Sequence, residues 1–179
     1  MPALGLFGLL TGTLVLLGCY TSAVEPVQAK PKVTIPKDAQ TLVVGGGCFW
    51  CIESQYEELK GVLDVESGYA GGETPNATYK DLGSGAEVVK VTFDPKIITR
   101  SDLLHIFFVM HDPTTLNRQG PDVGTQYRSV VFYANEAEKA LALKIRDEIA
   151  KERLSPNPSM TTSGAVTSDT TGERYTHDC

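Results

Sequence analysis

The chemistry in this sequence centres on a cysteine that follows three glycines. The stretch is Val43-Val44-Gly45-Gly46-Gly47-Cys48-Phe49-Trp50-Cys51-Ile52-Glu53. An apolar, strand-like run stops at the glycines, which allow a sharp turn and a close approach of the backbone or a substrate. Cys48 then starts a helix-like pattern, where unpaired N–H groups and the positive end of the helix dipole favour a thiolate. The position predicts a nucleophilic thiol.

A second cysteine, Cys51, follows three residues later, and two aromatic residues lie between them. Positions i and i+3 are neighbours on a helix, so a modest local movement would allow the two sulfurs to be joined. Phe49 and Trp50 place two large rings beside the Cys48 sulfur. The alternative is a buried cysteine in a core helix, because free cysteine packs as a small hydrophobe.

Five polar side chains further along the chain could accompany this thiol. Tyr69 and Tyr79 lie in a glycine-rich loop, Glu87 opens a strand, and Asp122 and Tyr127 flank Gly-Thr-Gln. Taken singly, loop tyrosines more often cover apolar surface than take part in catalysis. Glu87 alone is most simply a solvated strand end.

Length and composition predict one globular domain without a metal. The 179 residues suffice for a real core, and the formal net charge of -6 argues against a general nucleic-acid binder. Four cysteines are too few for a disulfide scaffold. A zinc site would need two ligands beyond Cys48 and Cys51. The histidines have no matching spacing: His105, His111 and His177. No nucleotide motif appears, and nothing indicates an oligomer, so we expect a monomer without cofactor.

The N-terminus resembles an export signal. Residues 1–19 contain an almost wholly apolar stretch too short for a comfortable membrane span. Its end, Leu-Leu-Gly-Cys19, resembles the lipobox of bacterial lipoproteins, in which cleavage leaves the cysteine lipidated. Cleavage after a small residue such as Ala23, or a buried N-terminal helix, are the alternatives. Residues 20–39 would then form a flexible tether. This predicts a protein of the cell envelope or periplasm, with membrane contact only through a lipid anchor; a secreted or cytoplasmic location is the alternative.

Periodicity predicts an α+β domain over residues 40–154, followed by a polar, mobile tail over residues 155–179. The predicted strands are Thr41–Val44, Val62–Ser67, Glu87–Phe93 and Tyr127–Tyr133. The predicted helices are Cys48–Leu59, one with Ser101 as N-cap, and one from Asn135 to near Leu154. The order β-α-β-β-α-β is typical of a two-layer, ferredoxin-like (split β-α-β) sandwich with a mixed sheet and here an extra C-terminal helix.

Five ordered segments resemble the A-type peptide methionine sulfoxide reductases. They are Gly47–Trp50, Ser67–Gly72, Pro75–Tyr79, Ala86–Val89 and Asp122–Ser129. The resemblance covers roughly residues 42–153. It implies thiol-dependent reduction of methionine-S-sulfoxide, free or in peptides and proteins, as a repair of oxidative damage.

The same resemblance assigns a role to each residue of the set. Cys48 would attack the sulfoxide sulfur, while Phe49 and Trp50 would form the apolar wall around the substrate methyl group. Glu87 would protonate the sulfoxide oxygen, Tyr79 and Tyr127 would hydrogen-bond it, and Asp122 would belong to the polar rim. Protonation makes the sulfur more electrophilic, a task suited to a carboxylic acid with a raised pKa.

The same resemblance implies how the Cys48 thiol is regenerated after the reaction. Cys48 would become a sulfenic acid and condense with a second thiol to a disulfide. Cys51 is the nearest such thiol, and Cys179 is the alternative. A thioredoxin-like dithiol would then reduce the disulfide.

The sequence departs from the family pattern in two places. The Thr-Gly-His that usually precedes Ala-Glu is missing before Glu87, and residues 160–178 are Ser/Thr-rich where the family carries a His-Gln-bearing segment. Two other functions stay open: an inactive relative that binds peptides, and a general thiol–disulfide oxidoreductase.

Overall fold

The computed structural model describes residues 34–74, 77–78, 80–153, 165–168 and 176–177, with side chains up to residue 152. The predicted leader, Cys19 and most of the tether lie outside these residues, as do Tyr79 and Cys179. In the part that is described, no helix is long and apolar enough to cross a membrane.

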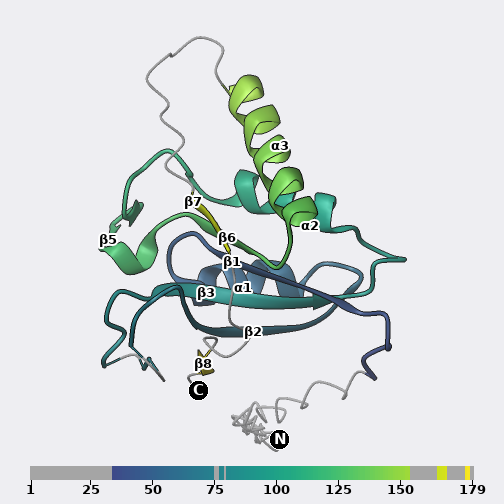
Figure 1. The fold of residues 1–179 in the computed structure, drawn as a ribbon, viewed down its shortest axis with the longest axis horizontal. Helices are drawn as coiled ribbons and strands as arrows, with labels where there is room; N and C mark the ends of the chain where they lie inside the picture. The colour runs from purple at the N-terminus through teal and green to yellow at the C-terminus, as the bar shows by residue number, and fades with distance from the viewer. Residues whose placement is uncertain (1–33, 75–76, 79, 154–164, 169–175, 178–179) are drawn as a thin grey trace, which may run out of the picture. The chain divides into compact units, whose positions relative to one another are not determined.

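A six-stranded sheet forms the centre of the domain, in the order β7-β6-β1-β3-β2-β8 (Figure 1). The strands are β1 (Gln40–Gly45), β2 (Val62–Ala70), β3 (Ala86–Phe93), β6 (Val130–Tyr133), β7 (Ala165–Ser168) and β8 (Thr176–His177). Strand β3 lies antiparallel between β1 and β2, and β6 is antiparallel to β1. Strand β8 is antiparallel to β2, whereas β7 is parallel to β6. The predicted α+β class with a mixed sheet is confirmed.

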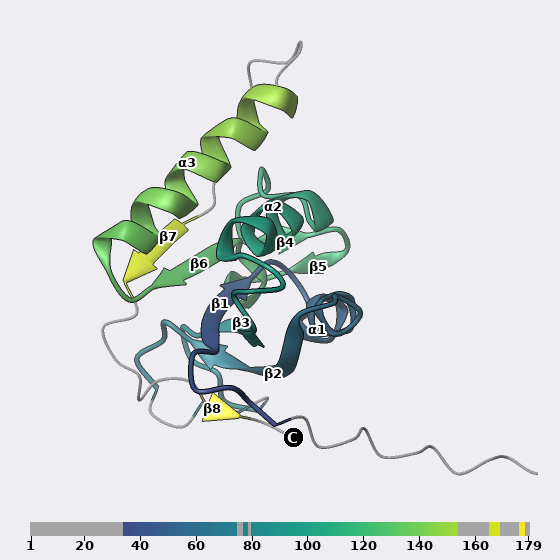
Figure 2. The same ribbon diagram turned by 90° about the vertical axis from the view of Figure 1, so that its right-hand side faces the viewer.

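Three helices cover one face of the sheet. They are α1 (Phe49–Glu57), α2 (Arg100–Met110) and α3 (Glu136–Arg153). Alternate strand residues such as Leu42, Val89 and Val91 pack against them in the main core, since side chains of a strand point alternately to its two faces. Figure 2 shows α1 and α2 on the same side of the sheet. A smaller cluster, which includes Val88 and Phe132, covers the opposite face.

The predicted helix starts were correct for one helix and wrong for another. Helix α3 follows Asn135, whose side chain accepts a hydrogen bond from the Glu138 N–H at 3.0 Å. Helix α2 is capped by Thr99, not by Ser101. The Thr99 hydroxyl accepts from the Asp102 N–H at 3.1 Å, and the Asp102 carboxylate accepts from the Thr99 N–H at 3.0 Å. This reciprocal pair satisfies two N–H groups that Ser101, already inside the helix, could not.

The predicted fourth strand was too long at its start. Strand β6 begins only at Val130, and Tyr127 lies in the short 3-10 helix η1 (Thr125–Tyr127). The preceding loop contains a small hairpin of β4 (Arg118–Gln119) and β5 (Asp122–Val123). Strands β7 and β8 were not predicted, because they are only four and two residues long and their sequences, Ala-Val-Thr-Ser and Thr-His, carry no clear strand-like alternation.

Candidate active site

The glycine turn between β1 and α1 carries the candidate nucleophile. A Cβ on Gly45 would lie 2.5 Å from the carbonyl oxygen of Glu87. Gly47 has φ of +107°, and a Cβ there would lie 2.6 Å from Cγ of Gln119. Both distances are shorter than real Cβ contacts, so these positions need glycine for space and Gly47 needs it also for its conformation. The turn therefore packs closely against β3 and the β4–β5 hairpin.

Cys48 is the N-cap residue of α1, with φ of −57° and ψ of 120°. Its carbonyl oxygen accepts a hydrogen bond of 3.1 Å from the Cys51 N–H. The Cys48 side chain is half-buried, whereas Cys51 is exposed, and both are free thiols. Cys48 thus lies at the helix N-terminus that the sequence predicts, and Cys51 lies one turn further along α1.

The two thiols interact directly. The pKa of Cys51 is raised, chiefly because the surrounding protein removes water, then because of the negative charge of Cys48 and a hydrogen bond with it. The carboxylates of Asp122 and Glu87 raise this pKa further. Cys51 therefore holds its proton more strongly than an ordinary cysteine does.

Glu87 lies at the start of β3 with only 3% of its surface exposed. The reading of this residue as a solvated strand end is therefore wrong. Its Oε2 accepts a hydrogen bond of 3.2 Å from the backbone N–H of Phe49. Burial raises the pKa of Glu87, the Phe49 hydrogen bond lowers it, and the charge of Asp122 raises it, with a net shift upward. The carboxyl group is thus placed beside the Cys48–Phe49 peptide and holds its proton more strongly than an exposed glutamate.

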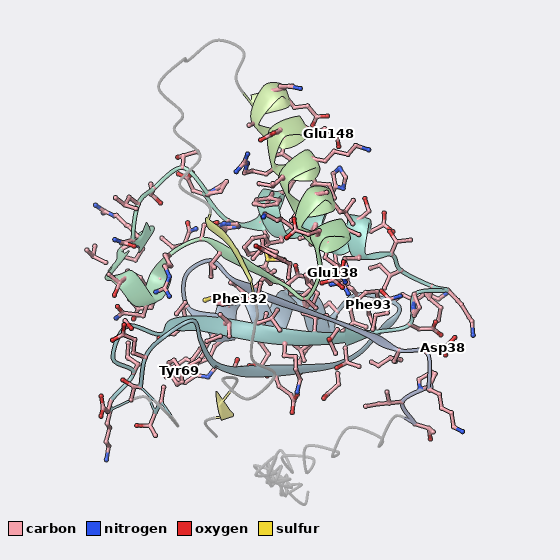
Figure 3. All side chains as sticks on the ribbon, in the orientation of Figure 1. Asp38, Tyr69, Phe93, Phe132, Glu138 and Glu148 are labelled. Carbon is pink, nitrogen blue, oxygen red and sulfur yellow. The ribbon has the colours of Figure 1, made fainter. Side chains whose placement is uncertain are left out.

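The two aromatic residues after Cys48 differ in burial. Phe49 is buried in the main core, and Trp50 is 59% exposed. Their ring centroids are 5.3 Å apart. Phe49 also contacts Tyr69 at 5.6 Å, and Tyr69 is fully buried near the end of β2 (Figure 3). Tyr69 thus packs against Phe49 from strand β2, whereas the sequence placed it in a glycine-rich loop.

Asp122 and Tyr127 come from neighbouring parts of one loop. Asp122 is half-buried in β5, and its charge acts on both Glu87 and Cys51, so the hairpin lies on the Cys48 side of the sheet. Tyr127 is half-buried in η1, which packs against β3. The structure therefore gathers Cys48, Cys51, Glu87 and Asp122 into one site and brings the Tyr127 segment to the same strand.

Two buried polar residues near the turn were missed by the sequence analysis. His111 is 8% exposed and Ser129 is 4% exposed, and they are hydrogen-bonded to each other. The sequence offered no signal for this pair beyond an isolated histidine. Within the described ranges, no group of three or more His, Cys, Asp or Glu side chains could hold a metal ion.

Comparison with known proteins points to one family. The family model for peptide methionine sulfoxide reductase matches residues 40–178. Proteins named peptide methionine sulfoxide reductase MsrA are similar: that of Nitratiruptor sp. is 56% identical over 111 residues, and that of Granulibacter bethesdensis is 50% identical over 127 residues. These matches cover 60% and 69% of this chain and 64% and 69% of the relatives.

Solved structures agree with the sequence matches. Methionine sulfoxide reductase A of Corynebacterium diphtheriae superimposes with a TM-score of 0.65 at 31% identity, over 80% of this chain and 71% of that one. Mxr1 of Saccharomyces cerevisiae in reduced form gives a TM-score of 0.69 at 29% identity, over 82% and 84%. The chain belongs to the peptide methionine sulfoxide reductase family.

Proposed function

We propose that this protein reduces methionine-S-sulfoxide, free or in peptides and proteins, to methionine. The observation that carries the proposal is the position of the Glu87 carboxyl group, buried and hydrogen-bonded to the peptide next to Cys48. Sulfoxide reduction needs a nucleophilic thiol and, close to it, a carboxylic acid that can protonate the sulfoxide oxygen. The similarity to relatives that carry this activity in their names supports the same conclusion.

In the first step, Glu87 gives its proton to the sulfoxide oxygen as the Cys48 thiolate attacks. Oxygen is transferred in the overall reaction: methionine leaves, and Cys48 becomes a sulfenic acid. The sulfoxide is reduced by two electrons, and the Cys48 sulfur is oxidised by two. Phe49 and Trp50 would provide apolar surface for the methyl group, and Tyr127 and Asp122 would form the polar side of the site. Tyr79, which the family resemblance adds to this polar set, lies outside the described residues.

In the second step, Cys51 resolves the sulfenic acid. Its thiol attacks the Cys48 sulfur, a disulfide forms, and the oxygen leaves as water. Cys51 is suited to this because it already hydrogen-bonds with Cys48 and lies one helical turn away. Cys179 is the alternative, and it lies outside the described residues.

In the third step, an external dithiol reduces the Cys48–Cys51 disulfide by exchange. The exposed position of Cys51 supports attack by another protein. The yeast protein Mxr1 has also been solved in complex with Trx2. A thioredoxin-like protein is the expected reductant, and the reaction uses no metal or organic cofactor.

The same proposal extends to the fold and the location. The order β6-β1-β3-β2, antiparallel throughout, supports a ferredoxin-like description of the four-stranded core. The apolar stretch within residues 1–19, ending at Cys19, supports export to the cell envelope with a lipid anchor. Mass spectrometry of the N-terminus from cells decides this: an unprocessed N-terminus on a cytoplasmic protein would overturn it.

The activity test uses the purified protein, dithiothreitol and each epimer of a methionine sulfoxide peptide separately. Loss of the S epimer only, abolished in Cys48→Ser, is the expected result. Disulfide exchange on a scrambled protein without sulfoxide reduction would favour a general oxidoreductase. Binding that survives Cys48→Ser without turnover would favour a peptide binder.

A further inference from the structure

The nucleophile and the Tyr127 segment leave the sheet at the same point. The last registered pair between β1 and β6 is Gly45 with Val130. Beyond this pair, β1 continues through the glycine turn to Cys48. Strand β6, followed back from Val130, leads through Ser129 to Tyr127. The two segments therefore leave the sheet at the same end of β1 and β6.

One side chain, His111, contacts both segments at this divergence. It is the C-cap residue of α2 and is buried. Its Nε2 lies 2.8 Å from the hydroxyl oxygen of Ser129. On the other side, a Cβ added to Gly46 would lie only 2.9 Å from Cδ2 of His111, so the ring packs directly on the glycine backbone.

The orientation of the His111 ring is fixed by its other contacts. Its Nδ1 lies 2.6 Å from the carbonyl oxygen of Phe107. A carbonyl oxygen only accepts, so Nδ1 carries a hydrogen and donates; in the neutral ring, Nε2 then accepts from the Ser129 hydroxyl. The Phe107 ring lies against the imidazole at a centroid distance of 4.3 Å. These contacts with Phe107 therefore hold the imidazole ring in a fixed orientation at the end of α2.

We propose that His111, through its hydrogen bond to Ser129 and its contact with Gly46, is a positioning residue that holds Cys48 at the correct distance from the Tyr127 segment. This inference rests on the proposed reductase function for its kinetic part. It extends that function because His111 lies outside the set of reacting groups and acts only through the two segments that carry them. Catalysis between groups on separate segments depends steeply on their separation.

The test compares His111→Asn, Ser129→Ala and the double variant in the full-length protein. Asparagine can still donate to Phe107 but is too short to reach Ser129. Each single variant should lower the single-turnover rate of methionine formation by roughly 10-fold to 100-fold and leave KM unchanged. The double variant should be no slower than the slower single variant, because both changes break the same link.

A matched control comes from the same helix. His105 is half-buried on α2, and its Nδ1 lies 2.9 Å from the Ser101 carbonyl oxygen. This contact matches the one between Nδ1 of His111 and the Phe107 carbonyl oxygen, also four residues earlier in the sequence. His105→Asn should lower thermal stability without slowing the single turnover. Wild-type single-turnover rates in the His111 and Ser129 variants, or losses that multiply in the double variant, would overturn the proposal.

Amide hydrogen exchange separates this inference from the proposed function. In both single variants, the peptides that contain Gly46 and Tyr127 should exchange faster together, while the centre of β3 keeps its wild-type protection. If the wild-type protein reduces neither epimer, the proposed function fails and the exchange pattern still decides the role of His111. Exchange that increases in only one of the two peptides would show that His111 does not link them.

Discussion

The backbone N–H of Phe49 donates a hydrogen bond of 3.2 Å to the buried carboxyl group of Glu87, 38 residues away in the sequence. This contact joins the first residue of α1 to the start of β3, directly after Cys48. It places the Glu87 carboxyl group beside the peptide that follows Cys48. The missing segment before Glu87 does not disturb the contact, because the β2–β3 ladder pairs Glu87 with Tyr69. The shortened loop closes further out, where a Cβ on Gly72 would lie 2.6 Å from the Gly85 nitrogen.

Replacing the carboxyl group tests its role as the acid. Glu87→Gln keeps the size of the side chain but cannot supply the proton, so kcat/KM for the S epimer should fall by about 100-fold to 10,000-fold. The rate of Cys48 alkylation should change far less. Glu66→Gln, on the neighbouring strand β2, is the control and should keep wild-type kinetics. Equal kinetics of Glu87→Gln and wild type would remove Glu87 from the mechanism.

The raised pKa of Glu87 predicts how stability depends on pH. The folded-state pKa lies above the ordinary 4.5, chiefly because of burial. The folded state therefore binds this proton more tightly than the unfolded state does. Its contribution to the free energy of unfolding is complete below pH 4.5 and is lost as pH rises through the folded-state pKa. Urea unfolding across this range should show a downward slope in wild type that is smaller in Glu87→Gln. An identical slope in both proteins would contradict the assignment.

The same shift predicts the pH dependence of activity. In the proposed mechanism Glu87 must be protonated, so the rate of the chemical step should fall as pH rises above its raised pKa. In single-turnover measurements, this fall should be absent in Glu87→Gln. A fall of the same size over the same pH range in both proteins would contradict the acid role of Glu87.

The resolving thiol can be identified by counting products. In Cys51→Ser, one equivalent of methionine per protein should form and turnover with a thioredoxin-like reductant should then stop, because the sulfenic acid has no partner one turn away. Cys179→Ser should turn over as wild type does. The reverse pattern would assign resolution to Cys179. Both products can be measured in the same sample: the methionine directly, and the sulfenic acid after it is trapped with dimedone.

Sequence patterns predicted helices and strands correctly where the local sequence and the packing of the fold favour the same structure. Strand β1 contains the apolar run Leu42–Val44, and Val89, Val91 and Phe93 alternate with polar residues in β3. The Gly-Gly-Gly-Cys48 turn combines a strand end with a helix start. These signals correctly placed Cys48 at the start of α1. The prediction of the α2 N-cap was wrong because Thr99 and Ser101 are both plausible N-cap residues. Only the hydrogen bonds between Thr99 and Asp102 distinguish them. The predicted start of β6 was wrong because Gly124, with φ of +154°, turns the chain into η1 before the strand begins.

Other parts of the site depend on contacts that sequence cannot show. The burial of Glu87 follows from the strands on either side of β3 and from α1 above it. The His111–Ser129 pair joins residues from different elements, and an isolated histidine gives no periodic signal. Strands β7 and β8 pair with β6 and β2 through backbone groups, which every residue carries, so the residue types of these short strands do not reveal the pairing.

The capping of α2 predicts a stability difference between two neighbouring positions. Thr99→Ala removes the hydroxyl that accepts from the Asp102 N–H, and should lower the free energy of unfolding by about 1 kcal/mol. Ser101→Ala, inside the helix, should cost less, because alanine has the higher helix propensity. Urea unfolding at neutral pH measures both. A larger loss for Ser101→Ala would restore Ser101 as the cap.

The glycine turn predicts a difference between two glycines with positive φ. A Cβ at Gly47 would lie 2.6 Å from Gln119, whereas a Cβ at Gly120 would meet nothing within 4 Å. Gly120→Ala should therefore cost only the backbone strain, about 1 kcal/mol. Gly47→Ala adds a clash and displaces the turn that carries Cys48, so it should lose more stability and also activity. Gln119→Gly in the Gly47→Ala background removes both clashing atoms, the Gln119 Cγ at 2.6 Å and Cβ at 2.8 Å. Relative to Gln119→Gly alone, this double variant should recover the excess loss and keep only the strain. No recovery would show that the backbone conformation of Gly47, and not its contact with the β4–β5 hairpin, determines how Cys48 is held.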